Sequence, residues 1–139
     1  MSFAPAYLSA IAAQVGGLSA FLGGFAAAFL GTLLAINARG RLATTAIGFS
    51  AVSSVAFIVA VVGSTAVVAA LHPEGPGYGV AKVGGTQALM TLAFMLGLYA
   101  LLTSLGLSGW LRSRATGLTT SIVAAIGCVL LTGMLVSVG

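Results

Sequence analysis

Two amide side chains, Gln14 and Gln87, stand in otherwise apolar stretches of this sequence. A primary amide offers two N–H donors and a carbonyl acceptor, so it can tie two helices together or bind a polar solute. An amide buried without partners costs about 1–3 kcal/mol. We therefore expect both side chains to find partners, either as ties between helices or as a solute-binding pair.

The remaining reactive groups do not form a catalytic or metal-binding set. Cys128 is the single cysteine, so it makes no disulfide within the chain, and we expect a buried structural thiol. His72 and Glu74 are too few ligands for a metal site, and Lys82 is expected to extend to the membrane interface and pair with Glu74. We expect no enzyme activity, no metal and no cofactor.

Several hydroxyl groups and one short motif have two possible interpretations. Hydroxyls within the second apolar run either line a polar path or bond to carbonyls of their own helix, and we favour the second: Ser50, Ser53, Ser54, Ser64 and Thr65. Tyr99 has Thr103 one turn later as a local partner. Gly77-Tyr78-Gly79 has the core sequence of a potassium-channel filter, but Gly75-Pro76 precedes it, so a turn with Tyr78 at the membrane interface is favoured.

The composition places these residues in a membrane protein. Of 139 residues, 60% are hydrophobic and 4% are charged, and the mean hydropathy is +1.21. Water-soluble domains carry about 25% charged residues, so that class is excluded. The net charge of +4 comes from arginines in two short loops, and it does not indicate nucleic-acid binding.

Four apolar runs predict four transmembrane helices, and hence an all-α integral membrane protein. They cover residues 7–36, 42–71, a third run from between 80 and 84 to 107, and 118–138. The connections are 37–41, a Pro/Gly-rich stretch at 72–79, and 108–117. We expect a single transmembrane domain, 1–139, whose partners include the lipid bilayer.

The arginines predict the orientation of these helices. Arg39 and Arg41 lie in the first connection, and Arg112 and Arg114 lie in the third. Positively charged loops remain in the cytoplasm, so both termini are predicted outside the cell membrane.

A shift of 73 residues superposes the two halves of the sequence. It places Arg39 on Arg112, Arg41 on Arg114, and Gln14 on Gln87. This register predicts an internal repeat of about 1–66 and 74–139. Each copy is a helical hairpin with an even number of spans, so the two copies form a parallel repeat about an axis along the membrane normal.

Small residues recur every three or four positions on the first and third runs. This spacing predicts a smooth seam for close helix packing, with bulky side chains on the opposite face. The seam residues are Ala10, Ala13, Gly17, Ala20, Gly24, Ala27 and Gly31, with Ala93, Gly97, Ala100 and Ser104 on the third run. The two seams face each other or face other subunits, and the sequence leaves both arrangements open.

These observations favour a non-catalytic membrane subunit that packs through its Gly/Ala seams into a homo-oligomer or a larger membrane complex. The alternative is a small passive channel or transporter for a neutral or weakly polar solute. Ion coupling through an intramembrane carboxylate is excluded, because the apolar runs contain neither Asp nor Glu.

Overall fold

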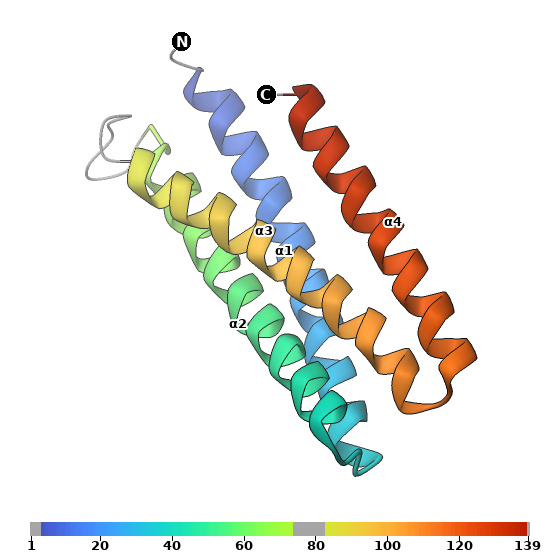
Figure 1. Cartoon of the computed structure of the whole chain (residues 1–139). Coiled ribbons are helices and arrows are strands. Elements are labelled where there is room, and N and C mark those ends of the chain that lie inside the picture. Colours follow the sequence, from blue (N-terminus) through green and yellow to red (C-terminus); the bar gives the residue numbers. More distant parts are fainter. Residues whose placement is uncertain (1–3, 74–82, 139) are drawn as a thin grey trace. The chain divides into compact units, whose positions relative to one another are not determined.

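The computed structural model describes residues 4–73 and 83–138, and all secondary structure in those ranges is helical (Figure 1). The long helices are α1 (Pro5–Ala35), α2 (Arg41–Ala70), α3 (Gly84–Ser108) and α4 (Arg114–Val138), with a short 3-10 helix, η2 (Gly109–Leu111), before α4. All four long helices are sufficiently long and apolar to cross a membrane. The chain therefore has the features of a multi-pass membrane protein.

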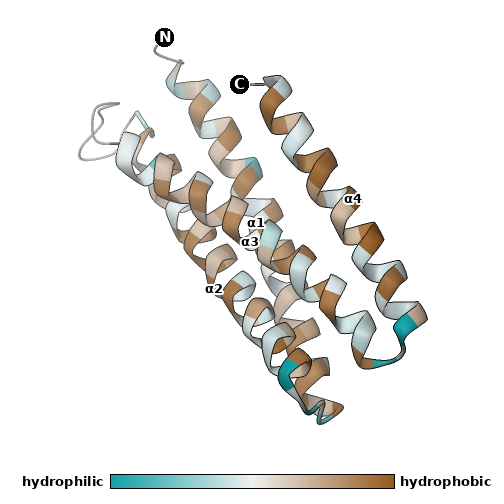
Figure 2. Cartoon of the chain, viewed as in Figure 1, coloured by the Kyte–Doolittle hydropathy of each residue, from teal (hydrophilic) through white to brown (hydrophobic). Residues whose placement is uncertain are grey.

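Apolar residues lie all around each helix, as expected for helices surrounded by lipid and by other helices. Figure 2 shows hydrophobic residues along the full length of the four ribbons, whereas the strongly hydrophilic ones gather at the connections between helices. All four arginines lie at these connections, and their side chains are exposed: Arg39, Arg41, Arg112 and Arg114.

The turn between α1 and α2 depends on two residues with positive φ. Asn37 has a φ of 49°, which is uncommon for a residue with a Cβ but most tolerated by asparagine and aspartate. Gly40 has a φ of 105°, where a side chain would be strained. These two residues reverse the chain direction within the five residues between Ala35 and Arg41.

The connection between α3 and α4 is shorter than the sequence predicted. The predicted loop 108–117 and the predicted start of the fourth span at 118 are wrong, because α4 already begins at Arg114. Ser113 makes this early start possible: its Oγ accepts a hydrogen bond from the Thr116 backbone N–H at 3.1 Å, as an N-cap does. Gly117 lies directly against the Trp110 ring, a contact that leaves no room for a larger residue.

Contacts within the chain divide it into two compact units. The first comprises Met1–Phe25 and Ser54–Gly97, and the second comprises Ala26–Ser53 and Leu98–Gly139. Parts of α1, α2 and α3 contribute to each unit, while α4 belongs wholly to the second.

In the first unit, Phe57 of α2 packs between glycines of two neighbouring helices. A Cβ added at Gly23 of α1 would lie 3.1 Å from the Phe57 Cβ, and one added at Gly97 of α3 would lie 2.9–3.0 Å from three ring atoms. The ring also meets Phe94 edge-on, with 6.1 Å between centroids and 67° between planes. Phe57 is fully buried, so the close approach of the helices depends on the missing side chains of the two glycines.

A second cluster closes the other end of the first unit. Its buried members come from α1, α2 and α3 or directly beside them: Leu8, Ala12, Val67, Leu71, Val83 and Met90. Two glycine contacts flank this cluster, since Gly16 lies against the Ser64 side chain and a Cβ on Gly63 would lie 3.2 Å from the Met90 Cβ. Along α1, Gly16 and then Gly23 contact Ser64 and then Phe57 of α2, so residue numbers rise on one helix as they fall on the other. The same holds for the contacts between α2 and α3, so consecutive helices are antiparallel here.

In the second unit, buried serine hydroxyls join the helices. Ser50 of α2 donates to the Ala26 carbonyl of α1 at 3.1 Å, and Ser104 of α3 donates to the Ala46 carbonyl of α2 at 2.8 Å. Both serines are fully buried. An interhelical hydrogen bond in a membrane contributes about 0.6 kcal/mol on average, so these bonds reinforce close packing rather than replace it.

Gly97→Leu tests the glycine contact with Phe57. We expect a loss of stability of about 1–3 kcal/mol, because the new side chain would overlap a ring that is already packed against α1. Thermal unfolding in detergent measures the change. Gly48→Leu is the matched control, since a Cβ at Gly48 of α2 meets nothing within 4 Å; equal unfolding temperatures for the two variants would contradict the packing.

Candidate packing surfaces

The predicted seam residues of α1 all lie on the outside of this chain. Seven small residues are exposed: Ala10, Ala13, Gly17, Ala20, Gly24, Ala27 and Gly31. A Cβ added at any of the three glycines would meet no atom within 4 Å. This face of α1, which we call the α1 stripe, is therefore open along about six turns of helix.

The predicted seam residues of α3 are buried, and two of them, Gly97 and Ser104, contact α2. Ala93, Gly97, Ala100 and Ser104 all have little or no exposed surface. Gly97 packs against Phe57 in the first unit, and Ser104 bonds to Ala46 in the second. Small residues with the same spacing thus lie buried on α3 and exposed on α1.

A different set of small residues forms the face of α1 that packs against its own chain. These are Ala12, Gly16, Ser19, Gly23 and Ala26, of which Gly16, Gly23 and Ala26 contact α2. Sequence reasoning missed this set, although its members also recur every three or four residues. Ser19 is 1% exposed, and its Oγ has no hydrogen-bond partner among the described residues.

The two glutamines lie in different environments within the first unit. Gln14 of α1 is exposed, whereas Gln87 of α3 is half-buried. On α1, Gln14 lies three residues before Gly17 and so borders the α1 stripe. An exposed amide on an apolar helix still requires a polar partner, which lipid chains do not supply.

The hydroxyl groups bond both within and between helices. Thr65 and Thr103 each donate to the carbonyl four residues earlier in their own helix, that of Val61 and of Tyr99. Ser64 likewise bonds within α2, but Ser50 reaches α1, which the sequence did not predict.

Tyr99 bonds both along its own helix and across the second unit. Thr103, the predicted local partner, donates to the Tyr99 backbone carbonyl at 2.8 Å, while the Tyr99 hydroxyl lies 2.8 Å from the Thr132 Oγ of α4. Thr132 already donates its proton to the Cys128 carbonyl at 2.8 Å, which leaves Tyr99 as the donor.

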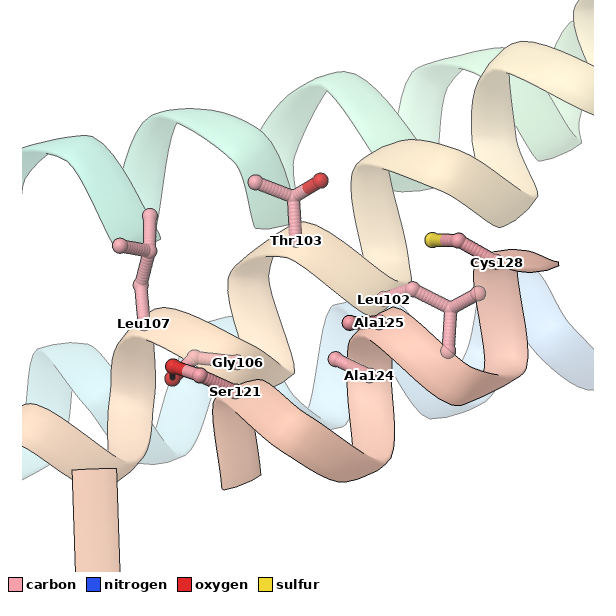
Figure 3. A pocket seen from close by; sticks show the side chains of 8 residues that line it. All are labelled: Leu102, Thr103, Gly106, Leu107, Ser121, Ala124, Ala125 and Cys128. Carbon is pink, nitrogen blue, oxygen red and sulfur yellow. Dashed lines mark hydrogen bonds between the residues drawn. The ribbon is translucent and has the colours of Figure 1, made fainter. Parts of the chain in front are cut away.

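Polar contacts and a groove characterise the packing of α3 with α4. Trp110 donates to the Ser121 Oγ at 2.8 Å, and Thr120 donates to the Gly106 carbonyl at 3.0 Å. Figure 3 shows the groove beside these contacts, lined by Leu102, Thr103, Gly106, Leu107, Ser121, Ala124, Ala125 and Cys128. The most apolar stretch of α4 has no buried residue, against 39% in α2, so most of α4 is uncovered.

The described residues contain no group of three side chains that could hold a metal ion. His72 is exposed and Cys128 is half-buried in the groove of Figure 3. Glu74, Lys82 and the motif 77–79 lie outside the described residues.

The bond between Tyr99 and Thr132 is tested by a double-mutant cycle. Tyr99→Phe, Thr132→Val and the double variant should give a coupling free energy of about 0.6 kcal/mol, typical of interhelical bonds in membranes. Chemical denaturation from mixed micelles measures the four stabilities. Purely additive losses would show that the two hydroxyls do not support each other.

We compared the chain with protein-family profiles, with curated protein sequences and with solved structures, and none of the three comparisons gave a match.

Proposed function

We propose that this protein is a non-catalytic integral membrane subunit that assembles through the α1 stripe, either with copies of itself or within a larger membrane complex. The observation that supports it is the exposure of all seven stripe residues. Lipid is as apolar as the side chains, so helix association depends on close contact, and small residues permit that contact. On α3, Gly97 and Ser104 of the corresponding seam are buried against α2, so small residues of this kind already support close helix packing within the chain.

Gln14 also supports the proposal that another helix packs against α1. Its side chain is exposed, and it borders the stripe about one turn from Gly17. A polar group without partners in hydrocarbon costs about 1–3 kcal/mol by protein mutational data. A neighbouring helix on the stripe would lie within reach of this amide and could supply a carbonyl or a hydroxyl.

The proposed orientation places both arginine-containing connections in the cytoplasm and both termini outside. It rests on the segregation of Arg39, Arg41, Arg112 and Arg114 to alternate connections. The proposed repeat makes α1–α2 and α3–α4 two hairpins of the same orientation, and its support is the register that pairs these arginines and the two glutamines.

Gly24→Leu tests assembly through the stripe. We expect the variant to fold, because a Cβ at Gly24 meets nothing within 4 Å of its own chain, but to lose its larger assembly. The isobutyl group would hold a neighbouring helix away and remove the close contact. Size-exclusion chromatography after mild detergent extraction measures the assembly.

Two matched controls accompany Gly24→Leu. Gly48→Leu adds the same side chain at another exposed glycine, and Leu22→Ala removes a bulky, half-buried residue from the face opposite the stripe. Both should keep the assembly of the unmodified protein. The same elution volume for Gly24→Leu and Gly48→Leu would show that the stripe faces lipid.

Cysteine labelling tests the orientation. With Cys128 replaced by serine, a membrane-impermeant maleimide applied outside should not reach Ala38→Cys or Ala115→Cys, which flank the arginines, and should reach Gly75→Cys. Labelling of Ala38→Cys from outside would contradict the orientation, and labelling of only one of Ala38→Cys and Ala115→Cys would contradict the parallel repeat. Permeabilised cells provide the control, because all three positions should then react.

A further inference from the structure

The α2–α3 contact provides a pattern for the uncovered face of α4. In the first unit, Gly97 packs against Phe57, and Gly63 packs against Met90. In the second unit, Ser104 bonds to the Ala46 carbonyl. At each of these three contacts, a small residue on one helix allows the other helix to approach closely. The two helices are antiparallel.

The shift of 73 residues transfers this contact to two other helices. Residues of α3 correspond to residues of α1, and residues of α2 correspond to residues of α4. The counterparts of the three α3–α2 pairs are Gly24 with Leu130, Gly17 with Val136, and Gly31 with Thr119.

Both sets of counterparts are uncovered in this chain. Gly17, Gly24 and Gly31 are open to a distance of 4 Å, while Leu130 and Val136 are 62% and 77% exposed. The α3 and α2 residues to which they correspond are buried or half-buried. One such contact, between α2 and α3, is therefore formed within the chain. The corresponding surfaces of α4 and α1 could form a second one, but both are uncovered.

We propose that a second copy of this chain packs its α4 on the α1 stripe, with the contact that α3 and α2 make within one chain. This inference rests on the proposed function and adds the identity and the orientation of the partner. Leu130 of one copy lies over Gly24 of the next, as Phe57 lies over Gly97. Copies that share one orientation in the membrane place α4 antiparallel to α1, as α2 is to α3.

The contact is heterologous, because each copy offers α1 on one side and α4 on the other. Heterologous contacts repeat from copy to copy, and they end only where the rotation between copies closes a ring. An isologous pair, in which α1 meets α1, would instead stop at two copies.

Disulfide crosslinking between two differently tagged chains tests the proposal. Both chains carry Cys128→Ser; one also carries Gly24→Cys and the other Leu130→Cys. Neither change should disturb the fold, since Gly24 has open space and Leu130 is largely exposed. Oxidation in native membranes should give a covalent dimer that carries both tags, and a chain with both cysteines should give a ladder of higher multiples.

The control replaces Leu130→Cys by Ala125→Cys. Ala125 is also exposed on α4, but five residues place it about 140° around the helix, so little crosslinking to Gly24→Cys is expected. A dimer of two Gly24→Cys chains would overturn the proposal in favour of an isologous contact. If size exclusion shows an assembly but Gly24 and Leu130 do not crosslink, the inference fails while the proposed function stands. A monomer by size exclusion contradicts both.

Discussion

Phe57 is the residue on which the packing of the first unit depends. Its side chain is fully buried between Gly23 of α1 and Gly97 of α3, and it meets Phe94 edge-on. In a bilayer, apolar side chains gain little by leaving lipid, so helices associate through the quality of their contacts. A large ring against two glycines gives many such contacts, because the backbones on both sides can approach it closely.

In the second unit, hydrogen bonds join neighbouring helices, and the helices are not covered equally. Ser50 and Ser104 join α2 to α1 and α3 by buried bonds, whereas the bonds between α3 and α4 involve exposed or half-buried groups. Most of α4 consequently remains uncovered. An apolar helix can face lipid at no cost, so this exposure is stable, yet it also leaves α4 available to a neighbouring chain.

The helices were largely predictable from the sequence, because long apolar runs must close all backbone hydrogen bonds internally in a membrane. The start of α4 was not, since the Ser113 cap and the contact of Trp110 with Gly117 outweigh a locally polar, glycine-containing stretch. The small residues of α1 were recognised, but two sets with similar spacing lie on this helix. Only the packing shows that Gly16 and Gly23 face α2 while Gly17 and Gly24 face outward. The partner of the Tyr99 hydroxyl, Thr132, likewise lies 33 positions away in the sequence.

The central claim is that this chain is a subunit whose α1 stripe is covered in the native membrane. Native mass spectrometry of the unmodified protein, released from lipid nanodiscs without prior delipidation, tests it most directly. The expected mass corresponds to several protein chains, either copies of this chain alone or this chain with other membrane subunits. A mass equal to one chain with bound lipid would contradict it.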